Sequence, residues 1–127
     1  MIVPPLRLSP SRILIVADDN LIGGYLVELV QDFGHLALGP LASNARGLAL
    51  LRGETPNAAL LDCMLSDGVA LPVAQALRAA KVPFAVLTGL DETQLSPVLA
   101  AAPRVTKPLA EAQIELMLRV LLATEGD

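Results

Sequence analysis

Aromatic residues are almost absent from this sequence, since its 127 residues include two phenylalanines, one tyrosine and no tryptophan. Hydrophobic residues nevertheless make up 54% of the chain and are mostly leucine, alanine and valine. The length suffices for one domain with a buried core. An aliphatic core of this kind is typical of helices packed on a parallel sheet that is buried on both faces.

Cysteine, long apolar runs and clustered positive charge are also scarce. The one cysteine, Cys63, excludes an internal disulfide framework. No uncharged run approaches the roughly 18 apolar residues that a membrane span requires, and the first ten residues do not resemble a signal peptide. Nine basic residues are scattered through a chain of net charge −4, so no nucleic-acid surface is expected. We therefore expect a soluble cytosolic protein that binds neither membranes nor nucleic acids.

Short apolar runs alternate with amphipathic stretches along the chain. The expected strands are residues 13–17, 36–38, 58–61, 84–88 and 104–106. The expected helices are residues 21–33, 44–52, 69–80, 91–101 (interrupted by Pro97) and 109–123. This alternation predicts an α/β, three-layer (βα)5 flavodoxin-like fold with a parallel five-stranded sheet in the order 2-1-3-4-5. The domain is expected to span residues 12–123, between an irregular leader (1–11) and a tail (124–127).

Polar residues follow the predicted strands at the point where each strand ends. Asp18 and Asp19 follow the first strand, Asp62 follows the third, Thr88 is the last residue of the fourth, and Lys107 follows the fifth. Functional groups gather at the carboxyl ends of the strands in such sheets. With the first and third strands as neighbours, Asp18 and Asp62 would share a pocket. Two carboxylates that close need a cation between them, and Mg²⁺ is the natural one.

A carboxylate, a hydroxyl and an ammonium group at separate strand ends suit phosphoryl transfer. The carboxylate can attack phosphorus and hold it as an acyl phosphate. A metal ion and the ammonium group offset the charge of the transferring group, and the hydroxyl can donate to one of its oxygens. Each residue alone is commonplace, but the ordered set predicts a phosphoryl-transfer site.

From residue 12 to about residue 122 the sequence resembles the receiver domains of two-component response regulators, the CheY-like superfamily. The matching segments are ILIVADDN (13–20), LLD (60–62), DG (67–68), LTG (87–89) and TKP (106–108). The stretch PFAVLTGL (83–90) is similar to an alphaproteobacterial subgroup with Thr-Gly after the fourth strand.

The resemblance implies a role for each residue at the strand ends. Asp62 would be the phosphoacceptor and a metal ligand, Asp18 a second Mg²⁺ ligand, and the Met64 main-chain carbonyl a third. Thr88 would contact the phosphoryl group and Lys107 would pair with it. The Lys-Pro peptide bond that follows is typically cis in this family.

The acidic pair departs from the family pattern. Counting back from Gly34-His35 places Asp18 at the direct-ligand position and Ala17 at the position of the first acid. Asp19 is then a candidate metal ligand that compensates in part, and Mg²⁺ binding should be weakened because affinity follows ligand charge. A second alignment, in which Asp18 and Asp19 form the usual pair, stays open.

The aromatic switch of many receivers has no counterpart here. Arg104 stands three residues before the lysine, where an aromatic residue is common, and Leu90 replaces the aromatic of the subgroup. Phosphorylation is therefore expected to produce an altered or small structural response.

Other candidate residues have simpler interpretations. Cys63 is expected to be a buried structural thiol, and His35 a surface or loop residue. The side chains of Met64 and Met117 are expected to pack in the interior. Asp67-Gly68 is expected to form a turn.

These observations favour a stand-alone signalling receiver rather than an enzyme in the ordinary sense. Asp62 would take a phosphoryl group from a histidine kinase or phosphotransfer protein and later lose it to water. Output would pass through protein contacts at the fourth helix, fifth strand and fifth helix, or the domain would serve as a phosphate sink. A homodimer through its last helices is a hypothesis.

Two alternatives belong to other classes. A degenerate receiver could bind a partner without phosphorylation, which Ala17, Arg104 and Leu90 favour and Asp62, Thr88 and Lys107 oppose. A flavodoxin-like enzyme or nucleotide binder would share the fold, but the sequence has no glycine-rich phosphate loop.

Overall fold

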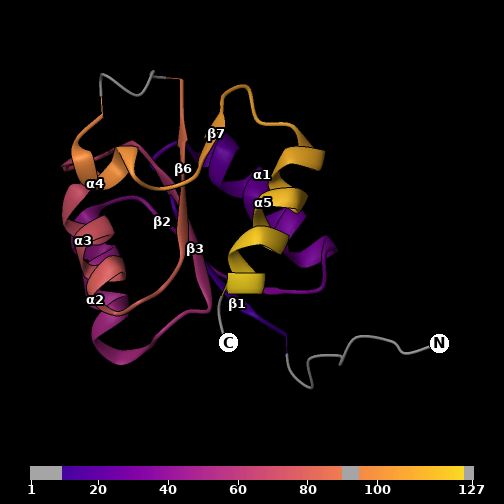
Figure 1. The fold of residues 1–127 in the computed structure, drawn as a ribbon, viewed down its shortest axis with the longest axis horizontal. Coiled ribbons are helices and arrows are strands. Elements are labelled where there is room, and N and C mark those ends of the chain that lie inside the picture. The colour runs from indigo at the N-terminus through magenta and orange to yellow at the C-terminus, as the bar shows by residue number, and fades with distance from the viewer. Residues whose placement is uncertain (1–9, 90–94, 125–127) are drawn as a thin grey trace.

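A sheet of five parallel strands forms the centre of the protein in a computed structural model that describes residues 10–89 and 95–124 (Figure 1). The strands are β1 (Arg12–Val16), β2 (Leu36–Leu41), β3 (Ala58–Asp62), β6 (Phe84–Thr88) and β7 (Arg104–Thr106). Their order across the sheet is β2-β1-β3-β6-β7. Counted along the chain, this is the predicted order 2-1-3-4-5, so the flavodoxin-like fold is confirmed.

Helices cover both faces of this sheet. Figure 1 shows α1 and α5 on one side and α2, α3 and α4 on the other. Their bounds are α1 (Asn20–Asp32), α2 (Asn44–Gly53), α3 (Leu71–Ala79), α4 (Pro97–Ala100) and α5 (Glu111–Thr124). None of the helices within the described ranges is long and apolar enough to cross a membrane.

Alternate residues of β1 enter two separate aliphatic cores. Ile13 and Ile15 belong to a cluster with apolar residues of α1 and α5, whereas Leu14 and Val16 belong to one with residues of α3 and α4. All four side chains are fully buried, as a strand covered on both faces requires. The same alternation decides which side chains at the ends of the strands share a face.

The first helix is bounded by residues suited to its two ends. The Asp19 carboxylate accepts hydrogen bonds from the main-chain N–H groups of Leu21 and Ile22, which makes it the N-cap. After the helix, Gly34 has a φ of +89°, a left-handed conformation that glycine adopts without a steric penalty. Gly34 therefore ends the helix, next to the predicted end at residue 33.

The fourth helix differs from its prediction. Its described part is a single turn, and Pro97 is the first residue of that turn rather than an interruption. Proline suits this position because N–H groups in the first turn of a helix have no carbonyl partner within the helix, so the missing N–H of proline costs no hydrogen bond. Residues 91–94 of the predicted helix, residues 1–9 of the leader, residues 125–127 of the tail and Leu90 lie outside the described residues.

The predicted loop after the third strand holds a short antiparallel hairpin. Its strands are β4 (Met64–Leu65) and β5 (Gly68–Val69), and α3 consequently begins at Leu71 rather than at residue 69. Gly68 has a φ of +120°, which allows the tight turn between the two strands. Two-residue strands have no detectable periodicity, so the sequence did not reveal them.

The second strand was also predicted too short. It continues to Leu41, although its sequence includes Pro40. Proline is tolerated because β2 lies at an edge of the sheet and Pro40 falls between Leu38 and Leu41, where the register of β2 against β1 shifts.

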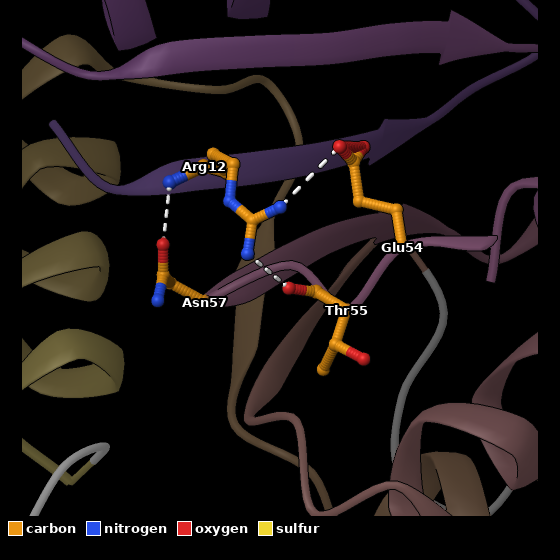
Figure 2. A network of polar contacts seen from close by, with 4 residues as sticks. All are labelled: Arg12, Glu54, Thr55 and Asn57. Carbon is orange, nitrogen blue, oxygen red and sulfur yellow. Dashed lines mark hydrogen bonds and ion pairs between the residues drawn. The ribbon is translucent and has the colours of Figure 1, made fainter.

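A polar network joins the amino ends of β1 and β3 (Figure 2). The Arg12 main-chain N–H donates to Asn57 Oδ1 at 2.7 Å, and the Asn57 N–H donates to the Arg12 carbonyl at 2.8 Å. The guanidinium of Arg12 donates to the Thr55 carbonyl and lies 3.3 Å from Glu54 Oε1. These contacts fix the register of the two strands, and hence the relative position of the residues at their opposite ends.

Candidate functional site

The register of the strands brings the candidate residues to one edge of the sheet. Val16 is paired with Leu61, Asp62 with Leu87, and Thr88 with Thr106. Asp62, Thr88 and Lys107 therefore lie at the carboxyl ends of three adjacent strands.

Two main-chain hydrogen bonds hold these strand ends together. The Cys63 N–H donates to the Leu87 carbonyl at 3.2 Å, and the Lys107 N–H donates to the Thr88 carbonyl at 3.1 Å. The main chain thus joins the residue after β3 to β6, and the last residue of β6 to the residue after β7.

Asp62 and Lys107 form an ion pair at this edge. Lys107 Nζ lies 2.9 Å from Asp62 Oδ1, with 8% of the Asp62 side chain and 31% of the Lys107 side chain exposed. A charge-assisted hydrogen bond of this length is among the stronger polar contacts in proteins. The Lys107-Pro108 peptide bond next to it is cis. The site thus holds a nearly buried carboxylate against a partly exposed cation.

Thr88 and Cys63 lie beside this pair. Thr88, the last residue of β6, is 3% exposed. Cys63 is 4% exposed and belongs to the core cluster of α3 and α4, as expected for a structural thiol that points away from the site.

Ala17 follows β1 directly beside Asp62. It is buried and belongs to the core cluster of α1 and α5, together with Ala58 and Leu60 of β3. Since Val16 is paired with Leu61, the next residues along the two strands are Ala17 and Asp62. Neighbouring strands lie about 5 Å apart, so a carboxylate at position 17 would project beside that of Asp62. This geometry matches the alignment that puts Ala17 at the position of the first acid.

The two acids after β1 have different surroundings. Asp18 is exposed at the same end of the sheet as Asp62. Asp19 Oδ1 lies 2.8 Å from the Leu21 nitrogen and 3.2 Å from the Ile22 nitrogen, so this oxygen is engaged by the start of α1.

The hairpin after Asp62 presents the Met64 carbonyl outward. The Ala70 N–H donates to the Cys63 carbonyl at 2.9 Å, and the next pair of the ladder is Met64 with Val69. Hydrogen-bonded and non-hydrogen-bonded pairs alternate in antiparallel ladders. Because Cys63 and Ala70 are hydrogen-bonded, Met64 and Val69 form a non-hydrogen-bonded pair, and their carbonyl groups point away from the partner strand. Accordingly, the Val69 carbonyl accepts a hydrogen bond from Asn44 Nδ2. Met64 is 54% exposed, which corrects the prediction that it packs in the interior.

Three oxygen-bearing groups at this edge are of the kind that magnesium binds, although no dense cluster of acidic, histidine or cysteine ligands occurs among the described residues. Among residues 10–89 and 95–124, no group of three or more His, Cys, Asp or Glu side chains could hold a metal ion. Mg²⁺ does not require such a cage, because it commonly keeps several waters and binds through one or two carboxylates. The carboxylates of Asp18 and Asp62 and the carbonyl of Met64 supply donors of the right chemical kind.

One buried polar residue near the site was missed by the sequence analysis. Asn44 is 5% exposed and its side chain contacts Asp67, Val69 and Val73. In the sequence it reads only as the first residue of a helix, because its partners lie 23 to 29 residues further along the chain.

No protein-family model and no curated protein matches this sequence. Several solved structures match it closely in three dimensions. SdrG from Sphingomonas melonis Fr1 is 30% identical, with a TM-score of 0.77 over 89% of this chain and 97% of that one. The receiver domain of the response regulator PhyR from Erythrobacter litoralis is 24% identical, with a TM-score of 0.80 over 94% and 95% of the two chains.

A third similar structure contains a metal ion. The receiver domain of a sensor histidine kinase from Pseudomonas aeruginosa PAO1 is 19% identical, with a TM-score of 0.80 over 91% of this chain and 99% of that one. Magnesium is coordinated in the active-site cleft of that domain.

Proposed function

The chain belongs to the receiver (CheY-like) domain family of response regulators, and from that premise we propose that Asp62 accepts a phosphoryl group in two-component signalling. The observation that carries the proposal is the Asp62–Lys107 pair at the carboxyl edge of the sheet, with Thr88 on the strand between them. The donor would be the phosphohistidine of a histidine kinase or phosphotransfer protein.

The reaction needs a nucleophile and charge compensation. An Asp62 oxygen would attack phosphorus as the phosphorus–nitrogen bond breaks, leaving the electron pair on the donor imidazole and an acyl phosphate on Asp62. The ammonium of Lys107 would remain protonated and pair with a phosphoryl oxygen, to which the Thr88 hydroxyl would donate. Attack of water on phosphorus would later release inorganic phosphate and restore the Asp62 carboxylate.

The ligands proposed for Mg²⁺ are the carboxylates of Asp62 and Asp18 and the carbonyl of Met64. Asp19 would add a further carboxylate at the margin of the site. Bound there, Mg²⁺ would offset the negative charge of the transferring group. The main departure is Ala17, which leaves the site one carboxylate short and should lower its affinity for the metal.

Output would pass through the surface formed by β7 and α5. Leu116 and Val120 lie one turn apart on α5 and are 62% and 47% exposed. Together with Arg104 and Gln113 they line a hollow of about 260 Å³. Exposed apolar side chains around a hollow suit a protein partner or a second copy of the chain. Arg104 stands where many receivers carry their aromatic switch, so the response at this surface should differ from theirs.

A second function is favoured by Ala17. Without an acidic residue at position 17, the domain could bind a partner protein in its unphosphorylated conformation and take part in signalling without phosphorylation. The fold and the output surface would serve either function. Whether Asp62 can be phosphorylated therefore distinguishes the two functions.

Intact-mass spectrometry after incubation with acetyl phosphate and Mg²⁺ tests the proposal. The wild type should gain one phosphoryl group, about 80 Da. Asp62→Asn keeps the shape of the side chain but removes the nucleophile, and it should gain nothing. A wild type that stays unmodified by acetyl phosphate and by purified histidine kinases would contradict the proposal and favour the phosphorylation-independent binding module.

A further inference from the structure

Asn44 uses its buried amide to join three elements near the phosphorylation site. Its Nδ2 donates to Asp67 Oδ1 at 3.1 Å and to the Val69 carbonyl at 3.0 Å. Its Oδ1 accepts a hydrogen bond from the Val73 N–H at 3.1 Å, at the start of α3. No side chain within α3 caps that helix, so Asn44 serves as its cap from the start of α2.

Asp67 makes the reciprocal connection from the turn of the hairpin. Its Oδ1 accepts from the Asn44 N–H at 2.9 Å and its Oδ2 from the Ala45 N–H at 3.1 Å. Ser43 caps the next N–H, that of Arg46, through its own Oγ. The Asp67 carboxylate therefore satisfies the first two N–H groups of α2 and lies at the positive end of the helix dipole.

These contacts hold the turn and the second strand of the hairpin that follows Asp62. Val69, which is bonded to Asn44, is the ladder partner of Met64. The Ser66 N–H in the turn donates to the Ala42 carbonyl at 3.0 Å. The hairpin is thus fixed to the start of α2 at its turn and along β5, on the side away from the Met64 carbonyl.

We propose that Asn44 and Asp67 form a clamp that positions the Met64 carbonyl for Mg²⁺. The inference rests on the proposed function, because it assigns these two residues to the metal site of that reaction. A main-chain carbonyl on an unrestrained loop would have to be ordered when the metal binds, whereas the clamp orders it beforehand. Both are positioning residues, since neither would touch the metal.

The proposal can be tested by Mg²⁺ titration of the unphosphorylated protein, followed by the NMR amide shifts of residues 62–70. Asn44→Ala and Asp67→Ala should each raise the dissociation constant for Mg²⁺ by about tenfold, the lower end of what loss of outer-sphere partners typically costs. The double variant should bind Mg²⁺ no more weakly than the single variant with the lower affinity, because the two substitutions disrupt the same clamp. Asp67→Asn, which keeps one acceptor oxygen, provides a milder variant if the alanine variant fails to fold.

Ser43→Ala is the matched control. It removes a cap from the same end of α2 but leaves the hairpin contacts in place, so it should lower stability and leave the dissociation constant within twofold of the wild type. A purely structural role for the clamp would make the Ser43 and Asp67 variants behave alike in the titration.

The outcomes separate this inference from the proposed function. If the wild type binds Mg²⁺ and the folded clamp variants bind it equally well, the clamp is overturned and the phosphoacceptor function stands. If the wild type neither binds Mg²⁺ nor is phosphorylated, both are overturned.

Discussion

Lys107 reaches Asp62 across the ends of β3 and β7, which are separated in the sheet by β6, and its Nζ lies 2.9 Å from the Asp62 oxygen. The aspartate is nearly buried, so the lysine is the cation that compensates its charge. A phosphoryl group on Asp62 would bring further negative charge to the same place, and the partly exposed ammonium can follow it. The same pair would therefore serve both the stability of the unmodified domain and the proposed transfer.

Removal of the lysine charge should destabilise the domain through Asp62. We expect Lys107→Met, which keeps the aliphatic stem, to lower the free energy of unfolding by about 1–3 kcal/mol, because it leaves a buried acceptor unsatisfied. Urea denaturation measures this change. Adding Asp62→Asn should restore much of the loss. A double variant as unstable as Lys107→Met would show that the lysine stabilises the fold through some other contact.

Asp19 should contribute mainly as a helix cap. Asp19→Ala is expected to lower the free energy of unfolding by about 1 kcal/mol, since it leaves two N–H groups of α1 without their acceptor. Asp19→Asn retains a capping oxygen and should keep the stability of the wild type. In an Mg²⁺ titration, Asp19→Asn should weaken binding less than Asp18→Asn does. The reverse order would make Asp19 the principal ligand of the two.

Asp67 should make the domain sensitive to acid. The Asn44 main-chain N–H, assisted by the Ala45 N–H and the Asn44 side chain, lowers the pKa of Asp67, although loss of hydration opposes the shift. A carboxyl group whose pKa is lower in the folded than in the unfolded protein stabilises the fold when it is ionised. This stabilisation is fully present above the unfolded-state pKa of about 3.9, and it is lost as the pH falls through the pKa of the folded state.

Urea unfolding of the wild type and Asp67→Asn between pH 7 and pH 2.5 measures this effect. The wild type should be the more stable near neutral pH, and its advantage should shrink below about pH 4 as the carboxyl is protonated. An advantage that stays constant over the whole range would contradict ionised Asp67 as the source of the stability.

The sheet and its site could be predicted because parallel strands impose strong patterns. A strand buried on both faces reads as a continuous apolar run, and the polar residue that ends it marks the edge where function collects. Asp62 and Thr88 each end such a run, whereas Lys107 follows the short strand β7, of which only Val105 is buried; the register places the three residues on adjacent strands. The ion pair itself links residues 45 positions apart and follows from strand order rather than from local sequence.

The connections that support the site could not be predicted in the same way. The hairpin β4–β5 is too short to show a period, and α4 begins at a proline that reads equally well as a break. The contacts of Asn44 depend on the packing of α2 beside α3. Only the folded chain brings its partners together.

A carboxylate at position 17 should strengthen the proposed metal site. We expect Ala17→Asp to tighten Mg²⁺ binding by about tenfold, equivalent to about 1.4 kcal/mol, because it adds one charged ligand beside Asp62. Without metal the new carboxylate would lie near Asp62 in a buried position, so the variant should be less stable than the wild type. Saturating Mg²⁺ should then stabilise it more than it stabilises the wild type.

Ala17→Asn is the control, since it adds a side chain of the same size without the charge. Titration calorimetry and thermal unfolding with and without Mg²⁺ measure both effects. If Ala17→Asn tightened binding as much as Ala17→Asp, the gain would come from an added oxygen donor rather than from charge. If neither variant changed the affinity, position 17 would not face the metal, and the alignment that pairs Asp18 with Asp19 would describe the site better.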